Sequence, residues 1–356
     1  MSLSRESSDM RAMRDIPEEV FDHYKSLGYP MAIDNIDMGL INKTYRISTH
    51  KTKYILQEIS PIFELTINED SQAVCQYLEA HHRIVPKIYP TDDGQLVKLI
   101  NKRVFRALRF IDGQCFNVVH SLSMAESAGK ILGDFHKTLL GFNYRYRSKW
   151  HHGGDYPHHK QNLHLALNNH GDHEYFHRVL PFANRMMDEM DALTGGLITT
   201  KRHVHGDPKI SNIMFDQDDR AICLVDLDTL GDSGWSLEMA SALRSWCNPN
   251  KEDVLDPRID MDIADHAIKG YAENMRGHFT LAEVDELLIH VQAVTLCLAM
   301  RYLTDVLNET YWAYDRDRFI RPADHNWLRA CAMHQLFARF QENRVLLKDM
   351  VLGHLF

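Results

Sequence analysis

The chain has 356 residues, and its 40 lysines and arginines against 49 aspartates and glutamates give a formal net charge of −9. An acidic chain offers a nucleic acid at most a local basic patch, so the charge argues against a general nucleic-acid-binding protein. Apolar residues make up 44% and charged residues 25%, which excludes wholesale disorder and predicts a large core. At roughly 100–200 residues per domain, the length fits two domains or one domain of two unequal lobes.

The cysteines and the apolar tracts bear on the compartment. The six cysteines are scattered, with no CxxC pair and no Cys/His spacing typical of a zinc site. The first thirty residues contain no apolar core of a signal peptide. The longest apolar tract, from Leu287 to Met300, falls short of the roughly 20 residues that span a bilayer. We therefore expect reduced thiols, a cytoplasmic location, and neither a membrane nor a nucleic acid as partner.

The first third of the chain has short runs rich in β-branched and aromatic residues. Residues 44–48 (TYRIS) and 53–59 (KYILQEI) flank a polar turn and predict a hairpin. Residues 69–81 have helical composition, and two further strand-like runs follow at 95–100 and 104–111. This order predicts a small antiparallel sheet with one helix.

Beyond Asp112-Gly113 the character becomes helical, with Ser121 as a plausible N-cap of the first helix. One β-like island, residues 203–230, interrupts this half. Residues 143–160 are basic and rich in histidine without a clear period, which favours a surface loop over a phosphate or metal contact. The pattern predicts an α+β protein with an N-terminal lobe over residues 20–112 and a helical lobe over 113–356. Helical periodicity is expected at residues 121–140, 175–193, 261–275, 281–308 and 325–347.

The segment with the clearest chemistry is residues 205–212 (HGDPKISN). In kinase-type phosphoryl transfer a loop Asp orients the attacking hydroxyl, and an Asn five residues later reaches a metal ion. Asp207 and Asn212 have this separation. A second Asp at the end of the next strand holds Mg²⁺ in such enzymes, and Asp226 ends an apolar strand here. Lys209 lies where a cation could meet the transferred phosphoryl group.

A structural explanation treats Asp207 as a turn cap, and Asp226 and Asp228 as surface residues. That explanation does not account for an apolar strand that delivers two carboxylates to its C-terminal end. The combined H-G-D-x-x-x-x-N, hairpin and D-x-D pattern therefore favours the catalytic interpretation over a chance match.

At these residues the chain resembles the aminoglycoside phosphotransferase/choline kinase family, which has the bilobal protein-kinase-like fold. It is most similar to the N-acetylhexosamine 1-kinase branch, over about residues 38 to 330. The matching stretches are NKTY (42–45), YILQ (54–57), RFI (109–111), GDFH (133–136), VDLDT (225–229), AMRYLTD (299–305) and HNWLR (325–329).

The resemblance implies ATP and Mg²⁺ as cofactors and assigns roles to individual residues. Asp207 would be the catalytic base, with Lys209 beside the transferred group. Asn212 and Asp226 would be Mg²⁺ ligands, and Asp228 a carboxylate beside them or on a second metal ion. A loop at residues 38–45 would cover the phosphates, and residues 108–113 would form the hinge that meets adenine. The expected nucleotide-binding residues are Gly39, Asn42, Thr44, Gln57, Arg109 and Ile111.

The chain departs from the kinase pattern at Gln57. Protein kinases place a Lys on the strand after the phosphate loop and pair it with a helix Glu. Gln57 can donate a hydrogen bond to a phosphate but supplies no charge, so neutralisation would fall on Mg²⁺ and Lys209. The departure leaves open a weakly active kinase or a non-catalytic binding protein.

Three residues are expected to contact the acceptor. The apolar seam of helix 281–308 continues onto Arg301 and Asp305, which suggests polar groups aimed into the helical lobe. The alternative is an ion pair within the helix. Arg244 lies on a helix expected to flank the active site.

We expect an ATP- and Mg²⁺-dependent kinase that phosphorylates a small polar acceptor. The acceptor suggested by the resemblance is a sugar hydroxyl, such as the anomeric one of a hexose or N-acetylhexosamine. The same fold also serves choline, amino alcohols, homoserine and aminoglycosides, and the sequence does not decide among these acceptors.

Overall fold

The structure is a computed structural model of the chain, and it describes residues 15–36, 41–149, 154–195, 197 and 200–356. The chain divides into two compact units. Unit 1 comprises Met1–Gln114, Phe142–Lys149 and Ile222–Leu230, and unit 2 comprises Cys115–Gly141, Trp150–Ala221 and Gly231–Phe356. Two segments from beyond the predicted boundary at residues 112–113 thus belong to unit 1.

Unit 1 is built on an antiparallel sheet with strand order β1-β2-β3-β6-β4, and β5 also pairs with β6. The predicted hairpin is confirmed, because β2 and β3 pair with Tyr45 opposite Leu56. Its aromatic and branched side chains alternate toward a core in which Ile47 and Tyr54 are fully buried. The strands are β1 (Pro30–Ile36), β2 (Lys43–Thr49), β3 (Lys53–Ile59), β4 (Ile88–Tyr89), β5 (Lys98–Ile100) and β6 (Arg103–Arg109).

Helix α3 (Ile67–Ala80) packs in unit 1 and anchors a segment from much later in the chain. Asp70 on α3 is 1% exposed. Its carboxylate accepts hydrogen bonds from the Tyr144 hydroxyl at 2.7 Å and from the backbone N–H groups of Arg147 and Ser148 at 3.0 and 2.9 Å. The first half of the predicted 143–160 surface loop is therefore fixed to α3. A short helix, α2 (Glu19–Asp22), completes unit 1.

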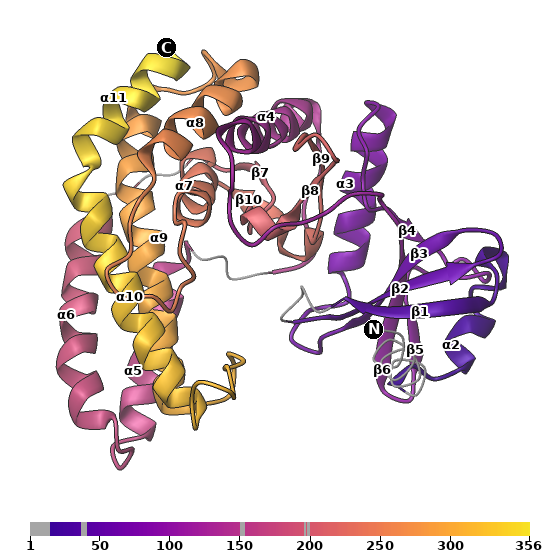
Figure 1. Cartoon of the computed structure of the whole chain (residues 1–356), viewed down its shortest axis with the longest axis horizontal. Helices are drawn as coiled ribbons and strands as arrows, with labels where there is room; N and C mark the ends of the chain where they lie inside the picture. Colours follow the sequence, from indigo (N-terminus) through magenta and orange to yellow (C-terminus); the bar gives the residue numbers. More distant parts are fainter. Residues whose placement is uncertain (1–14, 37–40, 150–153, 196, 198–199) are drawn as a thin grey trace. The chain divides into compact units, whose positions relative to one another are not determined.

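Unit 2 is mainly helical, and α9 (Leu281–Asn308) is its central element, with α5, α6, α7, α10 and α11 packed around it (Figure 1). A capping box between Thr280 and Glu283 starts α9. By length and composition α9 is the one described helix that could cross a membrane, yet 83% of its most apolar window is buried. The other helices are α4 (Leu122–Thr138), α5 (Tyr156–Asn169), α6 (Phe176–Thr194), α7 (Trp235–Trp246), α8 (Met261–Met275), α10 (Pro322–Glu342) and α11 (Arg344–Leu355).

Glycines allow the close approach of α4 and α8. A Cβ atom added at Gly129 would lie 1.9 Å from the backbone oxygen of Ala267, and one added at Gly270 would lie 1.9 Å from that of Glu126. No side chain fits at either position, so the two helix backbones are in direct contact.

Four short strands complete the fold. Strand β7 (Arg202–Val204) pairs with β10 (Gly231–Ser233), and β8 (Ile213–Phe215) and β9 (Ala221–Leu224) lie between them in sequence.

The predictions of secondary structure were wrong at two places. Residues 156–160 are helical, because Asp155 caps α5 by accepting from the His158 N–H. The predicted helix 325–347 is two helices that break at Asn343.

Candidate functional site

The HGDPKISN segment of unit 2 folds so that its polar side chains meet on one carboxylate. Gly206 has a φ of 88°, a conformation that favours glycine, and this turns the chain into the loop between β7 and β8. Asn212 donates from Nδ2 to the backbone oxygen of Asp207 at 2.9 Å and to its Oδ2 at 3.2 Å. Lys209 Nζ lies 2.8 Å from the same Oδ2. The sequence spacing therefore does bring Asp207, Lys209 and Asn212 together.

The environment of Asp207 favours its charged form. Burial raises the pKa of Asp207, but Lys209, His205 and Arg244 together outweigh burial and hold the pKa below its usual value. The side chain keeps 35% of its surface exposed, so a small molecule can reach it. An ionised carboxylate in this position can orient a hydroxyl group and accept its proton.

Helix α7 holds this loop in place, which the sequence analysis did not predict. Glu238, 3% exposed, accepts from the backbone N–H of His205 at 2.7 Å and of Gly206 at 3.1 Å. Burial raises the pKa of Glu238, but His136, His205 and the Gly206 N–H hold it below the usual value. The Trp246 indole N–H donates to the Pro208 carbonyl at 2.9 Å. Burial of Glu238 against a loop about thirty residues earlier cannot be read from the sequence, so no sequence signal indicated this role.

Arg244, an expected acceptor contact, is held by an acidic neighbour. Its Nη1 lies 2.9 Å from Oε1 of Glu252, and Tyr302 donates its hydroxyl to the other carboxylate oxygen. Arg244 nonetheless contributes positive charge at Asp207. The geometry thus favours an electrostatic role for Arg244 over direct binding of the acceptor.

In unit 1 a buried arginine stands beside Gln57. Arg106 on β6 pairs in register with Gln57 on β3 and is 3% exposed. It donates from Nε and Nη2 to Gln57 Oε1 at 2.9 and 2.7 Å, and from Nη1 to Asn68 at 3.0 Å. These bonds leave the Gln57 amide nitrogen facing Thr44 on β2, at 3.2 Å from its hydroxyl. Sequence analysis missed Arg106, because it lies on the adjoining strand and is separated from Gln57 by 49 positions.

The same guanidinium contacts Asp228. Arg106 Nη1 lies 2.7 Å from Asp228 Oδ1, and Nη2 donates to Oδ2 at 2.8 Å. Asn42 donates to Oδ2 as well, also at 2.8 Å, and accepts from the Ser60 N–H. Asp228 is 2% exposed. The side chains of Asp228 and Asn42 are therefore both engaged in contacts within unit 1.

Asp226 is a carboxylate in an unusual backbone conformation. It is exposed and has left-handed backbone angles, φ 63° and ψ 58°, which are uncommon outside glycine and cluster at functional sites. The Leu227 carbonyl that follows accepts from Ser71 of α3 at 3.1 Å, which anchors this turn. Mg²⁺ prefers oxygen ligands and is commonly held by one or two side chains together with substrate phosphates. Asp226 and Asn212 each carry a side-chain oxygen of the type that Mg²⁺ prefers. Within the described residues there is no cluster of three or more His, Cys, Asp or Glu that would hold a metal by itself.

The remaining residues expected to contact the nucleotide are Gly39, Arg109 and Ile111. Gly39 lies outside the described residues. Arg109 pairs with Glu79 and also donates its backbone N–H to the Lys87 carbonyl at 2.9 Å, so its side chain is engaged by α3. Ile111 is 8% exposed.

Arg301 and Asp305 both line a pocket of about 430 Å³ in unit 2, but only Arg301 is available to a ligand. Asp305, 2% exposed, accepts from the backbone N–H groups of Thr310, Tyr311 and Trp312 at 2.9, 3.0 and 2.8 Å and from Asn326 at 3.0 Å. These four bonds fill the carboxylate, which has about four acceptor positions. Asp305 therefore shapes the loop after α9 and also lines the pocket.

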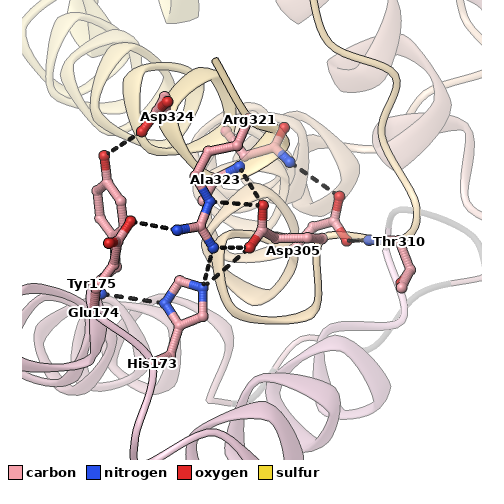
Figure 2. Close-up of polar contacts among 10 residues, drawn as sticks. His173, Glu174, Tyr175, Asp305, Thr310, Arg321, Ala323 and Asp324 are labelled. Carbon is pink, nitrogen blue, oxygen red and sulfur yellow. Dashed lines mark hydrogen bonds and ion pairs between the residues drawn. The ribbon is translucent and has the colours of Figure 1, made fainter. Parts of the chain in front are cut away.

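An ionic cluster fixes the two ends of that loop. Arg321 binds the carboxylate of Glu309 through two of its nitrogen atoms. It also contacts His173 and Glu174 in the turn before α6 (Figure 2). The hydrogen bonds from Arg321 lower the pKa of Glu309 to about 2. The loop from 309 to 321 is thus tied to the turn that connects α5 and α6.

Comparison with known proteins defines the class. A sequence profile of the phosphotransferase enzyme family matches residues 33–273, which is more than half of the chain. The chain therefore belongs to the phosphotransferase enzyme family.

Particular relatives add detail. The homoserine kinase of Zymomonas mobilis is 26% identical over 126 residues, which are 34% of this chain and only 38% of that enzyme's length. The structure of amicoumacin kinase in complex with AMP-PNP and Ca²⁺ is 16% identical, with a TM-score of 0.62 over 96% of each chain. The microcompartment-associated aminopropanol kinase is 15% identical, with a TM-score of 0.63 over 92% of this chain and 97% of its own. At these identities the structures show the fold, and the predicted α+β kinase-like class is confirmed.

Proposed function

We propose that the protein transfers a phosphoryl group from ATP, with a divalent cation, to a hydroxyl group of a small polar acceptor. The observation that carries the proposal is the loop in which Asp207, Lys209 and Asn212 meet. Membership of the phosphotransferase enzyme family supports it.

The residues of the chain have distinct tasks in this proposal. Asp207 orients the acceptor hydroxyl and accepts its proton at Oδ2 or Oδ1. Lys209 neutralises charge near the reacting atoms, and Glu238 holds the loop in position. Asn212 and Asp226 would hold Mg²⁺, which neutralises the phosphate charge when it is bound with ATP.

The Arg106–Gln57 pair supports nucleotide binding in spite of the missing lysine. Because Arg106 takes both acceptor positions of Gln57 Oε1, the amide must present its N–H donors on the opposite side, where one of them donates to the Thr44 hydroxyl. We assign Gln57 to donating a hydrogen bond to a phosphate oxygen. Arg106 orients and polarises that donor from one strand away.

For the acceptor we favour a hydroxyl-bearing amino compound. Two of the relatives named above act on homoserine and on aminopropanol, both of which combine an amino group with a hydroxyl group. The resemblance to the N-acetylhexosamine 1-kinase branch would instead favour a sugar, but none of the relatives named above is a sugar kinase.

ADP release from Mg-ATP tests the function. The acceptors to compare are homoserine, 3-aminopropan-1-ol, choline, an aminoglycoside and N-acetylglucosamine. We expect acceptor-dependent ADP release, and we expect Asp207→Asn to lower kcat by about 10²- to 10⁴-fold, as for loss of a general base. Asp218→Asn, the same change on an exposed turn, is the control and should match wild type.

Calorimetry with Mg-ATP separates catalysis from binding. Asp207→Asn should bind the nucleotide nearly as well as wild type. Turnover by Asp207→Asn at the wild-type rate would overturn the assignment of the base. Absence of Mg-ATP binding by the wild-type protein would overturn the proposal as a whole and favour a non-catalytic binding protein.

A further inference from the structure

The pocket that contains Arg301 is polar and lies wholly within unit 2. Helix α5, the end of α9 and the loop after it form its walls. Arg301 is the sole arginine or lysine among the described residues that line it. The other side chains of the lining that carry polar groups are His158, His159, Asn162, Asn169, Thr304, Asp305, Asn308, Thr310, Tyr311 and Trp312.

Arg301 differs from the arginines around it. Arg244, Arg318 and Arg321 each contact a carboxylate. Within the described part of the chain, Arg301 makes no hydrogen bond and no ion pair. Its guanidinium carbon lies 5.2 Å from the ring centre of Trp312 and 6.0 Å from that of Tyr311. Stacking on rings uses the face of a guanidinium and leaves its in-plane N–H donors for a ligand.

The acid nearest in sequence forms no ion pair with Arg301. Asp305 is one helical turn away, but its oxygens are filled by three backbone N–H groups and by Asn326. The same bonds hold Trp312 in place, and the Glu309–Arg321 contact anchors the rest of the loop (Figure 2). The aromatic wall beside Arg301 is therefore built before any ligand arrives, and an unpaired, partly buried cation favours an anion there.

A set of contacts leads from this wall to Arg244. The Trp312 ring lies 4.8 Å from that of Tyr302, centre to centre. Tyr302 donates to Glu252, and Glu252 pairs with Arg244. The positive charge of Arg244 in turn lowers the pKa of Asp207.

We propose that Arg301 binds a carboxylate of the acceptor, so that the protein phosphorylates hydroxy acids, and hydroxy amino acids in particular, in preference to the corresponding amino alcohols. This inference rests on the proposed function. A carboxylate matches the site because one guanidinium binds it with two parallel hydrogen bonds and balances its single charge.

Matched pairs of acceptors test the inference, because each pair differs only by the carboxylate. The pairs are homoserine and 3-aminopropan-1-ol, serine and ethanolamine, and threonine and 1-aminopropan-2-ol. With the full chain and Mg-ATP, we expect the acid to be the better substrate of at least one pair. Calorimetry in the presence of Mg-ADP should show binding of that acid and weaker binding of its partner.

Variants identify the residue responsible. Arg301→Gln should raise KM and the Kd for the acid by roughly 10- to 100-fold, with little change in kcat and little change for the amino alcohol. Arg301→Lys should restore part of the loss. Arg316→Gln is the control, because Arg316 also stacks on a ring of this loop, 5.7 Å from Tyr314, but does not line the pocket.

Several results would overturn the inference. They are a preference for the amino alcohol in every pair, absence of binding by all three acids, and an equal effect of Arg301→Gln on both members of a pair. Turnover of N-acetylglucosamine with an unchanged KM in Arg301→Gln would leave the proposed function standing and refute only the carboxylate site. Full activity of Asp207→Asn would refute the proposed function without affecting binding of the acids.

Discussion

Replacement of Arg106 by Met is the most informative perturbation of unit 1. The change keeps an unbranched side chain but removes a buried guanidinium that contacts Gln57, Asn68 and Asp228. Asp228, 2% exposed, would keep its charge with Asn42 as the remaining donor. Removal of one partner of a buried ion pair costs about 3–5 kcal/mol, because the other charge is left without compensation. We expect a loss of stability of this size, and a fall in Tm on the order of 10 °C.

Urea unfolding followed by circular dichroism measures the loss. Arg46→Met is the matched control, since Arg46 lies in the same sheet and pairs with Asp34 at 2.9 Å, but with both side chains about 40% exposed. Exposed pairs contribute about 0–1 kcal/mol. The double variant Arg106→Met/Asp228→Leu should recover much of the stability, because no buried charge remains. The reasoning would be refuted if Arg106→Met were no more destabilising than Arg46→Met.

Three further predictions concern unit 2. Gly129→Ala should destabilise the protein by about 1–3 kcal/mol because its Cβ would overlap the Ala267 carbonyl, whereas Gly353→Ala, with open space around it, should be neutral or stabilising in thermal unfolding. Glu238→Gln should lower kcat with little change in the Kd for Mg-ATP, since it loosens the Asp207 loop; an equal change in both quantities would contradict this role. The pKa of Glu309 is lowered to about 2 from an ordinary value of 4.5, so the stability it contributes is complete above about pH 4.5 and is lost as the pH falls toward 2. In urea unfolding, the free energy of unfolding should therefore fall less between pH 6 and pH 3 for Glu309→Gln than for wild type. An equal fall in the two proteins would disprove the assignment.

The sequence predicted correctly those elements that depend on a local pattern of residues. The β2–β3 hairpin and helices α8 and α9 follow from the spacing of apolar residues and from turn chemistry, and the observed bounds of α8 and α9 agree with the predicted ones. The contact between Asp207 and Asn212 is likewise local, because a single loop brings the two side chains together.

The sequence did not predict contacts across strands or between distant segments. Gln57 meets Arg106 only because β3 and β6 pair in one register, and a shift by one residue would place the two side chains on opposite faces. Asp226 and Asp228 are equivalent in the sequence pattern. The left-handed turn at Asp226 separates them, leaving one exposed and burying the other against Arg106.

The place of the Arg106 charge affects how related sequences are sorted. A survey that scores kinases by the lysine of the strand after the phosphate loop would classify this chain as a pseudokinase on account of Gln57. Yet a cation is present on the adjoining strand, in hydrogen-bonding contact with that glutamine. A criterion that examines paired strands together would detect the arginine that orients this glutamine, which a search for the lysine alone misses.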